Sequence, residues 1–135
     1  MLGDLIYEPK GRITGQRVLE VEVPKIEVSF SASGILKGGI EVVENVTYWS
    51  VARSPGIIYG EGQGVLMTKD GSDHGTWKGN GIGTMSGIGK TSFRGAIYFG
   101  NTSTGKLEFL NNIVGVYEYE TDDNGNTSAK VWHWK

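Results

Sequence analysis

Apolar side chains recur at every second position along much of this chain, and no stretch of helical length carries an apolar stripe with a 3.6-residue period. The clearest case is residues 25–32, where one face holds Ile26, Val28, Phe30 and Ala32 and the other holds Glu27, Ser29 and Ser31. This alternation is typical of a half-buried strand. About eight such segments, joined by short turns without crossover helices, predict an all-β fold with little helix, either a closed antiparallel barrel of about eight strands or a sandwich.

The 135 residues are predicted to form a single domain, 1–135, with one sizeable core. The chain has thirteen basic and fifteen acidic residues, and the basic residues are scattered along it. We therefore expect neither nucleic acid nor an anionic membrane as a partner. The chain has no cysteine, no apolar run near the roughly 20 residues of a membrane span, and no basic and apolar leader at its start. We therefore expect a cytoplasmic protein.

Turn signals and breaks in the alternation divide the chain into segments. The first expected strand runs from Arg17 to Val23, and a slip in phase near Val42 and Val43 predicts a β-bulge in the segment from Ile40 to Arg53. Residues 101–112 read as a loop with a short helical turn at 107–110. The Asn124-Gly125 step predicts a hairpin between the last two strands.

Two neighbouring segments carry glycine at alternate positions: Gly60, Gly62 and Gly64, then Gly79, Gly81 and Gly83. We call these six residues the glycine stripe. Each glycine in a strand costs roughly 0.5–1 kcal/mol relative to alanine, so the stripe must serve a purpose. It either lets the sheet curve and leaves room for large aromatic residues such as Phe30, Phe93 or Tyr117, or it leaves space for a ligand cavity.

Motifs for cofactor chemistry are weak. The segment Gly79–Gly83 lacks the spacing of a phosphate-binding loop. Asp122, Asn124 and Asn126 match the start of a calcium-binding loop, but the glutamate expected at its last position is absent. The two histidines, His74 and His133, are far apart in the sequence. We expect no metal ion and no cofactor.

Four segments resemble calycin-type barrels related to allene oxide cyclase: Tyr59–Gly64, Gly79–Gly83, Arg94-Gly95 and Thr104–Asn111. The resemblance runs from Tyr59 to Gly125, about half of the chain. It implies an eight-stranded barrel, often oligomeric, with a central cavity. It transfers no catalytic residue, although a Glu8-Pro9 pair lies near the N-terminus.

The leading functional hypothesis is a protein of this barrel type that binds a small, largely apolar molecule; the alternatives are an isomerase or cyclase that uses the same cavity, and a structural oligomerisation module. If the glycine stripe faces outward, the ligand-binding residues would be Tyr48, Trp49, Glu61, Gln63 and Arg94, with Glu61 as general base. If it faces inward, Glu61 and Arg94 are exterior groups. Apolar residues on both faces of the last strand, with Trp132 and Trp134 on one of them, predict a homo-oligomer.

Overall fold

The computed structural model describes residues 2–135, which form one antiparallel sheet of nine strands and a single turn of 3₁₀ helix, η1 (Glu108–Leu110). The expectation of an all-β protein with little helix is confirmed, and η1 lies within the helical turn expected at 107–110. The strands are β1 (Leu2–Tyr7), β2 (Lys10–Glu20), β3 (Lys25–Leu36), β4 (Ile40–Ser54), β5 (Ile57–Thr68), β6 (His74–Gly87), β7 (Lys90–Phe99), β8 (Val114–Thr121) and β9 (Asn126–Trp134).

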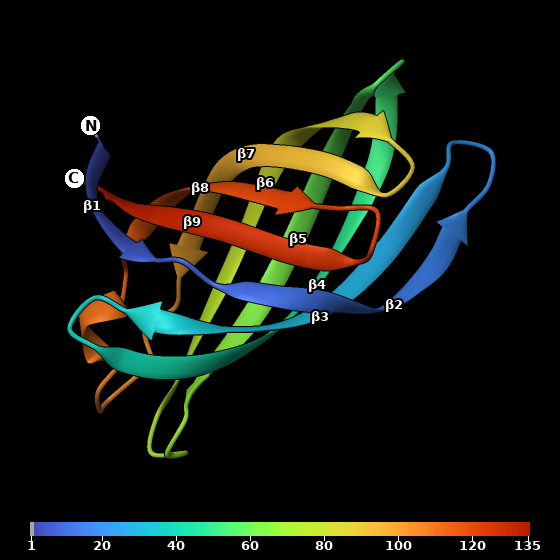
Figure 1. Ribbon diagram of the computed structural model, residues 1–135. Coiled ribbons are helices and arrows are strands. Elements are labelled where there is room, and N and C mark those ends of the chain that lie inside the picture. The colour runs from blue at the N-terminus through green and yellow to red at the C-terminus, as the bar shows by residue number, and fades with distance from the viewer. Residues whose placement is uncertain (1) are drawn as a thin grey trace.

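Eight of the strands form a ring. From β2 to β9 each strand pairs with the next, and β2 then pairs with β9 through Lys10 and Ser128, Gly11 and Thr127, and Arg12 and Asn126 (Figure 1). The ninth strand, β1, pairs with both β9 and β3. β1 was not expected from the sequence, and the strand expected at Arg17–Val23 is instead β2, which begins at Lys10 and ends at Glu20.

The inward side chains form two buried clusters. One lies toward β1 and includes Tyr7, Leu36, Val42 and Leu66, and the other includes Phe30, Val46, Ile58, Phe93 and Tyr119. Trp77 and Tyr117 pack against both. Burial of Val28, Phe30 and Ala32 confirms the predicted phase of β3.

The expected bulge near Val42 and Val43 is wrong. The pairing of β4 with β3 and with β5 runs without a shift through this region, and the irregularity lies instead between Ala52 and Ser54. The apolar pattern is interrupted for another reason: Glu44 occupies an inward position between Val42 and Val46. A buried carboxyl side chain in phase with the core is therefore the exceptional feature of β4.

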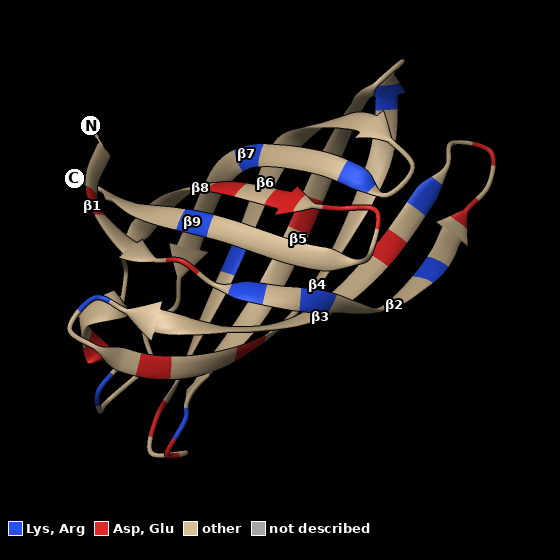
Figure 2. Ribbon diagram, viewed as in Figure 1, with Lys and Arg blue, Asp and Glu red and all other residues tan. Residues whose placement is uncertain are grey.

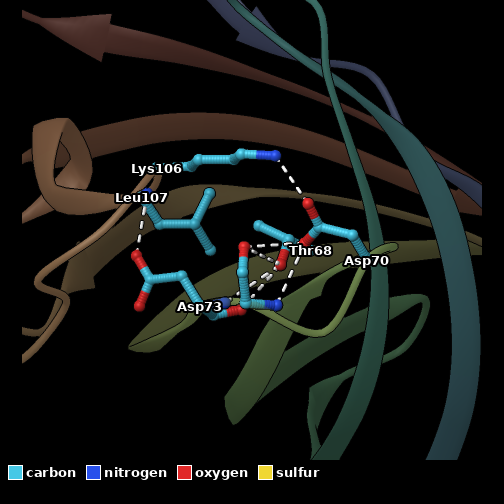
Figure 3. A network of polar contacts seen from close by, with 6 residues as sticks. Thr68, Asp70, Asp73, Lys106 and Leu107 are labelled. Atoms are coloured by element: carbon cyan, nitrogen blue, oxygen red, sulfur yellow. Dashed lines mark hydrogen bonds and ion pairs between the residues drawn. The ribbon is translucent and has the colours of Figure 1, made fainter.

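The loop between β7 and β8 closes the β1 end of the ring, because Leu107 and Leu110 from this loop are buried in the first cluster. The Asp73 carboxylate holds the loop by accepting hydrogen bonds from the backbone N–H groups of Gly105 (3.0 Å) and Leu107 (2.9 Å). Figure 3 shows the bond from Leu107. The hydrogen bond from Leu107 is the main cause that lowers the pKa of Asp73. We call residues 100–113 the capping loop.

Charged residues of both signs are interspersed along the strands (Figure 2). In the described part of the chain, no helix has the length and apolar character needed to cross a membrane.

Candidate functional site

The glycine stripe faces the interior of the ring. A Cβ atom on Gly62 would lie 2.8 Å from the Cβ of Tyr48, and one on Gly64 would lie 2.5 Å from Nε1 of Trp77. A Cβ on Gly83 would lie 2.8 Å from Cε1 of Phe93. Such distances are below van der Waals contact, so rings from this and neighbouring strands occupy the space that larger side chains would need. This geometry supports the architectural interpretation of the stripe.

Aromatic rings meet beneath the stripe. Phe30 stacks on Tyr119 with ring centroids 5.2 Å apart, while Tyr48 meets Tyr119 edge-on at 5.6 Å and Phe93 at 5.8 Å. The hydroxyl groups of Tyr48 and Tyr119 are hydrogen-bonded at 3.2 Å. Edge-on and offset contacts of this kind stabilise one arrangement of the rings.

The rings do not fill the interior completely, and a cavity of about 80 Å³ remains. Eight aromatic residues contribute to its wall, together with aliphatic residues and the backbone of the stripe at Gly60, Gly62 and Gly79. The volume is roughly half that of an engineered apolar cavity that binds benzene. The cavity therefore suits a small group rather than a large ligand.

Glu44 is the acidic side chain that β4 brings to this cavity, and it is only 5% exposed. Its Oε2 accepts a hydrogen bond from Nε1 of Trp77 at 2.7 Å, and its Oε1 accepts one from the hydroxyl of Tyr7 at 3.3 Å. The wall of the cavity contains no lysine, arginine or histidine among the described residues. Burial raises the pKa of Glu44 to about 7, against the opposing effect of the two hydrogen bonds.

The tyrosine hydroxyls around Glu44 remain protonated near neutral pH. Burial raises the pKa of Tyr7, Tyr48 and Tyr119 above the ordinary value, and it raises the pKa of Tyr117 to about 12. Glu44 is therefore the group in the cavity that can change its charge between mildly acidic and mildly basic conditions.

The five residues hypothesised as ligand-binding do not come together. Tyr48 lies in the wall of the cavity, but Trp49 lies on the outer face of β4, where it meets Tyr59 edge-on at 5.8 Å. The exposed carboxylate of Glu61 accepts a hydrogen bond from the Tyr59 hydroxyl at 2.7 Å. These positions follow from the inward direction of the stripe.

Glu61 borders the cavity, although its carboxylate is exposed, whereas Gln63 and Arg94 are not part of the cavity wall. Gln63 is exposed and borders an open hollow on the outer face of the sheet. Arg94 forms an ion pair with Glu118 at 3.6 Å, and both side chains are largely exposed. The structure therefore does not bring Glu61 and Arg94 together as a buried pair, and it presents Glu44, with Tyr7 and Trp77, as the polar group of the interior.

The sequence analysis missed Glu44 because it explained the interrupted pattern of β4 as a bulge. The signal was present: Val42, Glu44, Val46 and Tyr48 follow each other at every second position, which places the carboxyl on the inward face. The involvement of Tyr7 had no local signal, because β1 itself was not predicted.

Comparison with solved structures shows proteins of the same fold. A conserved protein of unknown function from Rhodopseudomonas palustris superimposes with a TM-score of 0.74 at 14% sequence identity, covering 98% of this chain and 97% of its own. A protein of unknown function from Clostridium acetobutylicum superimposes with a TM-score of 0.76 at 12% identity, covering 98% of both chains. At these identities the likeness establishes the fold alone.

No protein-family model matches this sequence, and no curated protein is similar enough in sequence to count as a relative.

Proposed function

We propose that this protein binds a small, largely apolar molecule inside a calycin-type barrel formed by the ring of eight strands. The observation that carries this proposal is the aromatic-walled cavity with a single buried carboxyl group, Glu44, that has no cationic partner in its wall. Burying an ionisable group costs free energy unless it is neutralised or paired. A purely architectural core would avoid this cost by placing an aliphatic residue at the same position.

The surroundings of the cavity support the assignment to the calycin type. The β1 end of the ring is covered by Tyr7 from β1 and by Leu107 and Leu110 from the capping loop. Apolar walls with a few convergent polar groups are the usual features of sites for small molecules. Here those polar groups are Glu44, the Trp77 indole N–H and the Tyr7 hydroxyl.

Binding of xenon and cyclopropane, which are small enough for a cavity of this volume, tests this proposal directly. We expect both probes to shift backbone and indole N–H resonances of cavity residues, including Trp77, in NMR spectra of the full chain. An Ala129→Leu variant, which adds bulk to the cavity wall, should lose the shifts, whereas Ala96→Leu on the outer face of β7 should retain them. Melting curves of both variants serve to check that the fold is intact. Absence of any probe-dependent shift in the wild-type protein would contradict the proposal.

A second candidate function is proton-transfer catalysis of the isomerase type, and the pKa of Glu44 near 7 favours it. A carboxyl group with this pKa can both accept and return a proton at neutral pH. The test is exchange of the α-protons of cyclopentanone for deuterium in D₂O, followed by NMR. Acceleration by the wild-type protein that is lost in Glu44→Gln would support catalysis. Equal exchange rates with and without protein would remove this candidate.

A further inference from the structure

We propose that the molecule bound in this cavity carries a small organic cation, of the size and kind of a methylated ammonium group, which Glu44 neutralises and the aromatic rings surround. The inference rests on the proposed function and specifies the chemical class of the ligand. It follows from three features of the interior: the unbalanced charge of Glu44, the chemistry of the walls and the size of the cavity.

Both oxygens of Glu44 accept hydrogen bonds from the protein. The indole N–H of Trp77 can only donate, and it lies 2.7 Å from Oε2, so this oxygen serves as an acceptor. The Tyr7 hydroxyl donates to Oε1 at 3.3 Å. A carboxylate offers about four acceptor sites, and these two bonds leave others toward the cavity.

The two hydrogen-bond partners of Glu44 and the tyrosines of the cavity wall are uncharged near neutral pH. Tyr7 comes from β1, Tyr48 from β4 itself, Trp77 from β6, and Tyr119 from β8. The raised pKa values keep the three tyrosines neutral over the whole range in which Glu44 ionises. The protein thus supplies hydrogen bonds to the carboxylate but no positive charge beside it. A cationic ligand would provide that charge.

The walls are suited to a cation without N–H donors. A methylated ammonium group cannot donate hydrogen bonds from its methylated positions, and it is attracted instead to the faces of aromatic rings. Phe30, Tyr48, Phe93 and Tyr119 form a continuous set of such rings on one side of the cavity. The volume of about 80 Å³ matches a head group of a few heavy atoms.

A neutral ligand that accepts a hydrogen bond from protonated Glu44 is the competing chemistry, and pH separates the two. A cation prefers ionised Glu44, so its affinity rises as the pH increases through the pKa of this group, about 7. A neutral acceptor prefers protonated Glu44, so its affinity falls over the same range.

The experiment compares choline with its uncharged isostere 3,3-dimethylbutan-1-ol, titrated into the full chain and followed by NMR. We expect choline to bind about tenfold or more tightly at about pH 8 than at about pH 5.5, and to exceed the alcohol at the higher pH. The Glu44→Gln variant should lose the preference for choline and its pH dependence. The exterior variant Glu118→Gln should keep both.

The outcomes distinguish this inference from the proposed function. Equal or tighter binding of the alcohol at the higher pH overturns the cationic ligand and leaves a neutral one in the same cavity. Failure of choline, the alcohol, xenon and cyclopropane alike contradicts the cavity as a binding site. If Glu44→Gln does not fold, the pH dependence of the wild-type protein still decides between cation and neutral acceptor.

Discussion

Replacing Glu44 by glutamine should change how the stability of the folded protein depends on pH. Burial raises the pKa of Glu44 from an ordinary value of 4.5 to about 7, so the folded protein retains this proton where the unfolded chain releases it. The contribution of the protonated group to stability is complete below the unfolded pKa and is lost as the pH rises through the folded pKa. At about 1.4 kcal/mol for each unit of pKa, the loss amounts to about 3 kcal/mol.

Glutamine is close in shape to protonated glutamic acid and does not titrate. The free energy of unfolding of Glu44→Gln relative to wild type should therefore rise by about 2–3 kcal/mol between about pH 5 and about pH 8. Groups with lowered pKa values, such as Asp73, act in the opposite sense and at lower pH, where stability is lost as the carboxylates become protonated. They are present in both proteins, so the comparison cancels them.

Denaturant unfolding followed by tryptophan fluorescence measures this difference, because urea can be titrated at each pH with both proteins in parallel. The exterior variant Glu118→Gln is the matched control, and its difference from wild type should stay within about 0.5 kcal/mol at every pH. A difference between Glu44→Gln and wild type that does not vary with pH would refute the argument that burial controls the ionisation of Glu44.

Three further predictions concern the stripe, the capping loop and self-association. Gly64→Ala should lower the stability by about 1–3 kcal/mol and shift the indole N–H resonance of Trp77, whereas Gly15→Ala, with open space around it, should change the stability by no more than about 1 kcal/mol. Asp73→Asn should lower the melting temperature by several degrees, because the capping loop loses a charged acceptor, while Asp123→Asn should not. Trp132 and Trp134 lie on the outer face of β9, with Trp134 exposed, and they lead us to propose a homo-oligomer; sedimentation as a monomer at high micromolar concentration would contradict it.

The parts of the fold that follow a simple alternation could be predicted from the sequence. In β3, Val28, Phe30 and Ala32 are buried at alternate positions, so periodicity indicated the phase of the strand, although Ile26 and Ile35 are exposed. The hairpin at Asn124-Gly125 was predictable because glycine there adopts a φ of +79°, which other residues rarely take.

The strands at the start of the chain were not predictable, for a physical reason. In β1 the adjacent residues Ile6 and Tyr7 are both buried, and its pairing with β9 shifts register twice, so no alternation appears in the sequence. Much of β2 is exposed on both faces, and only its end, from Arg17, lies within the segment whose alternation predicted a strand. These strands are specified by pairing with distant segments, which local sequence does not reveal.

The candidate site was only partly predictable. Simple alternation would place Tyr48 and Glu44 on the same face of β4, but the bulge expected near Val42 and Val43 obscured this phase. The direction of the stripe depends on which face of the sheet carries the bulky side chains. The direction of the stripe in turn decides whether the Glu61 side chain points into the ring or toward solvent. A pairing map of the strands would have settled both points.

The seam between β2 and β9 also bears on how this chain reaches its folded state. Arg12 and Asn126, which pair there, are 114 positions apart, while every other junction of the ring joins strands that follow each other in the sequence. Contacts between distant segments form late, since closing a long loop costs entropy before the contact is made. On a ribosome, β2 is therefore synthesised early and must wait with an open edge until the last strand emerges. Slow final closure, rather than slow hairpin formation, should set the folding rate of this protein.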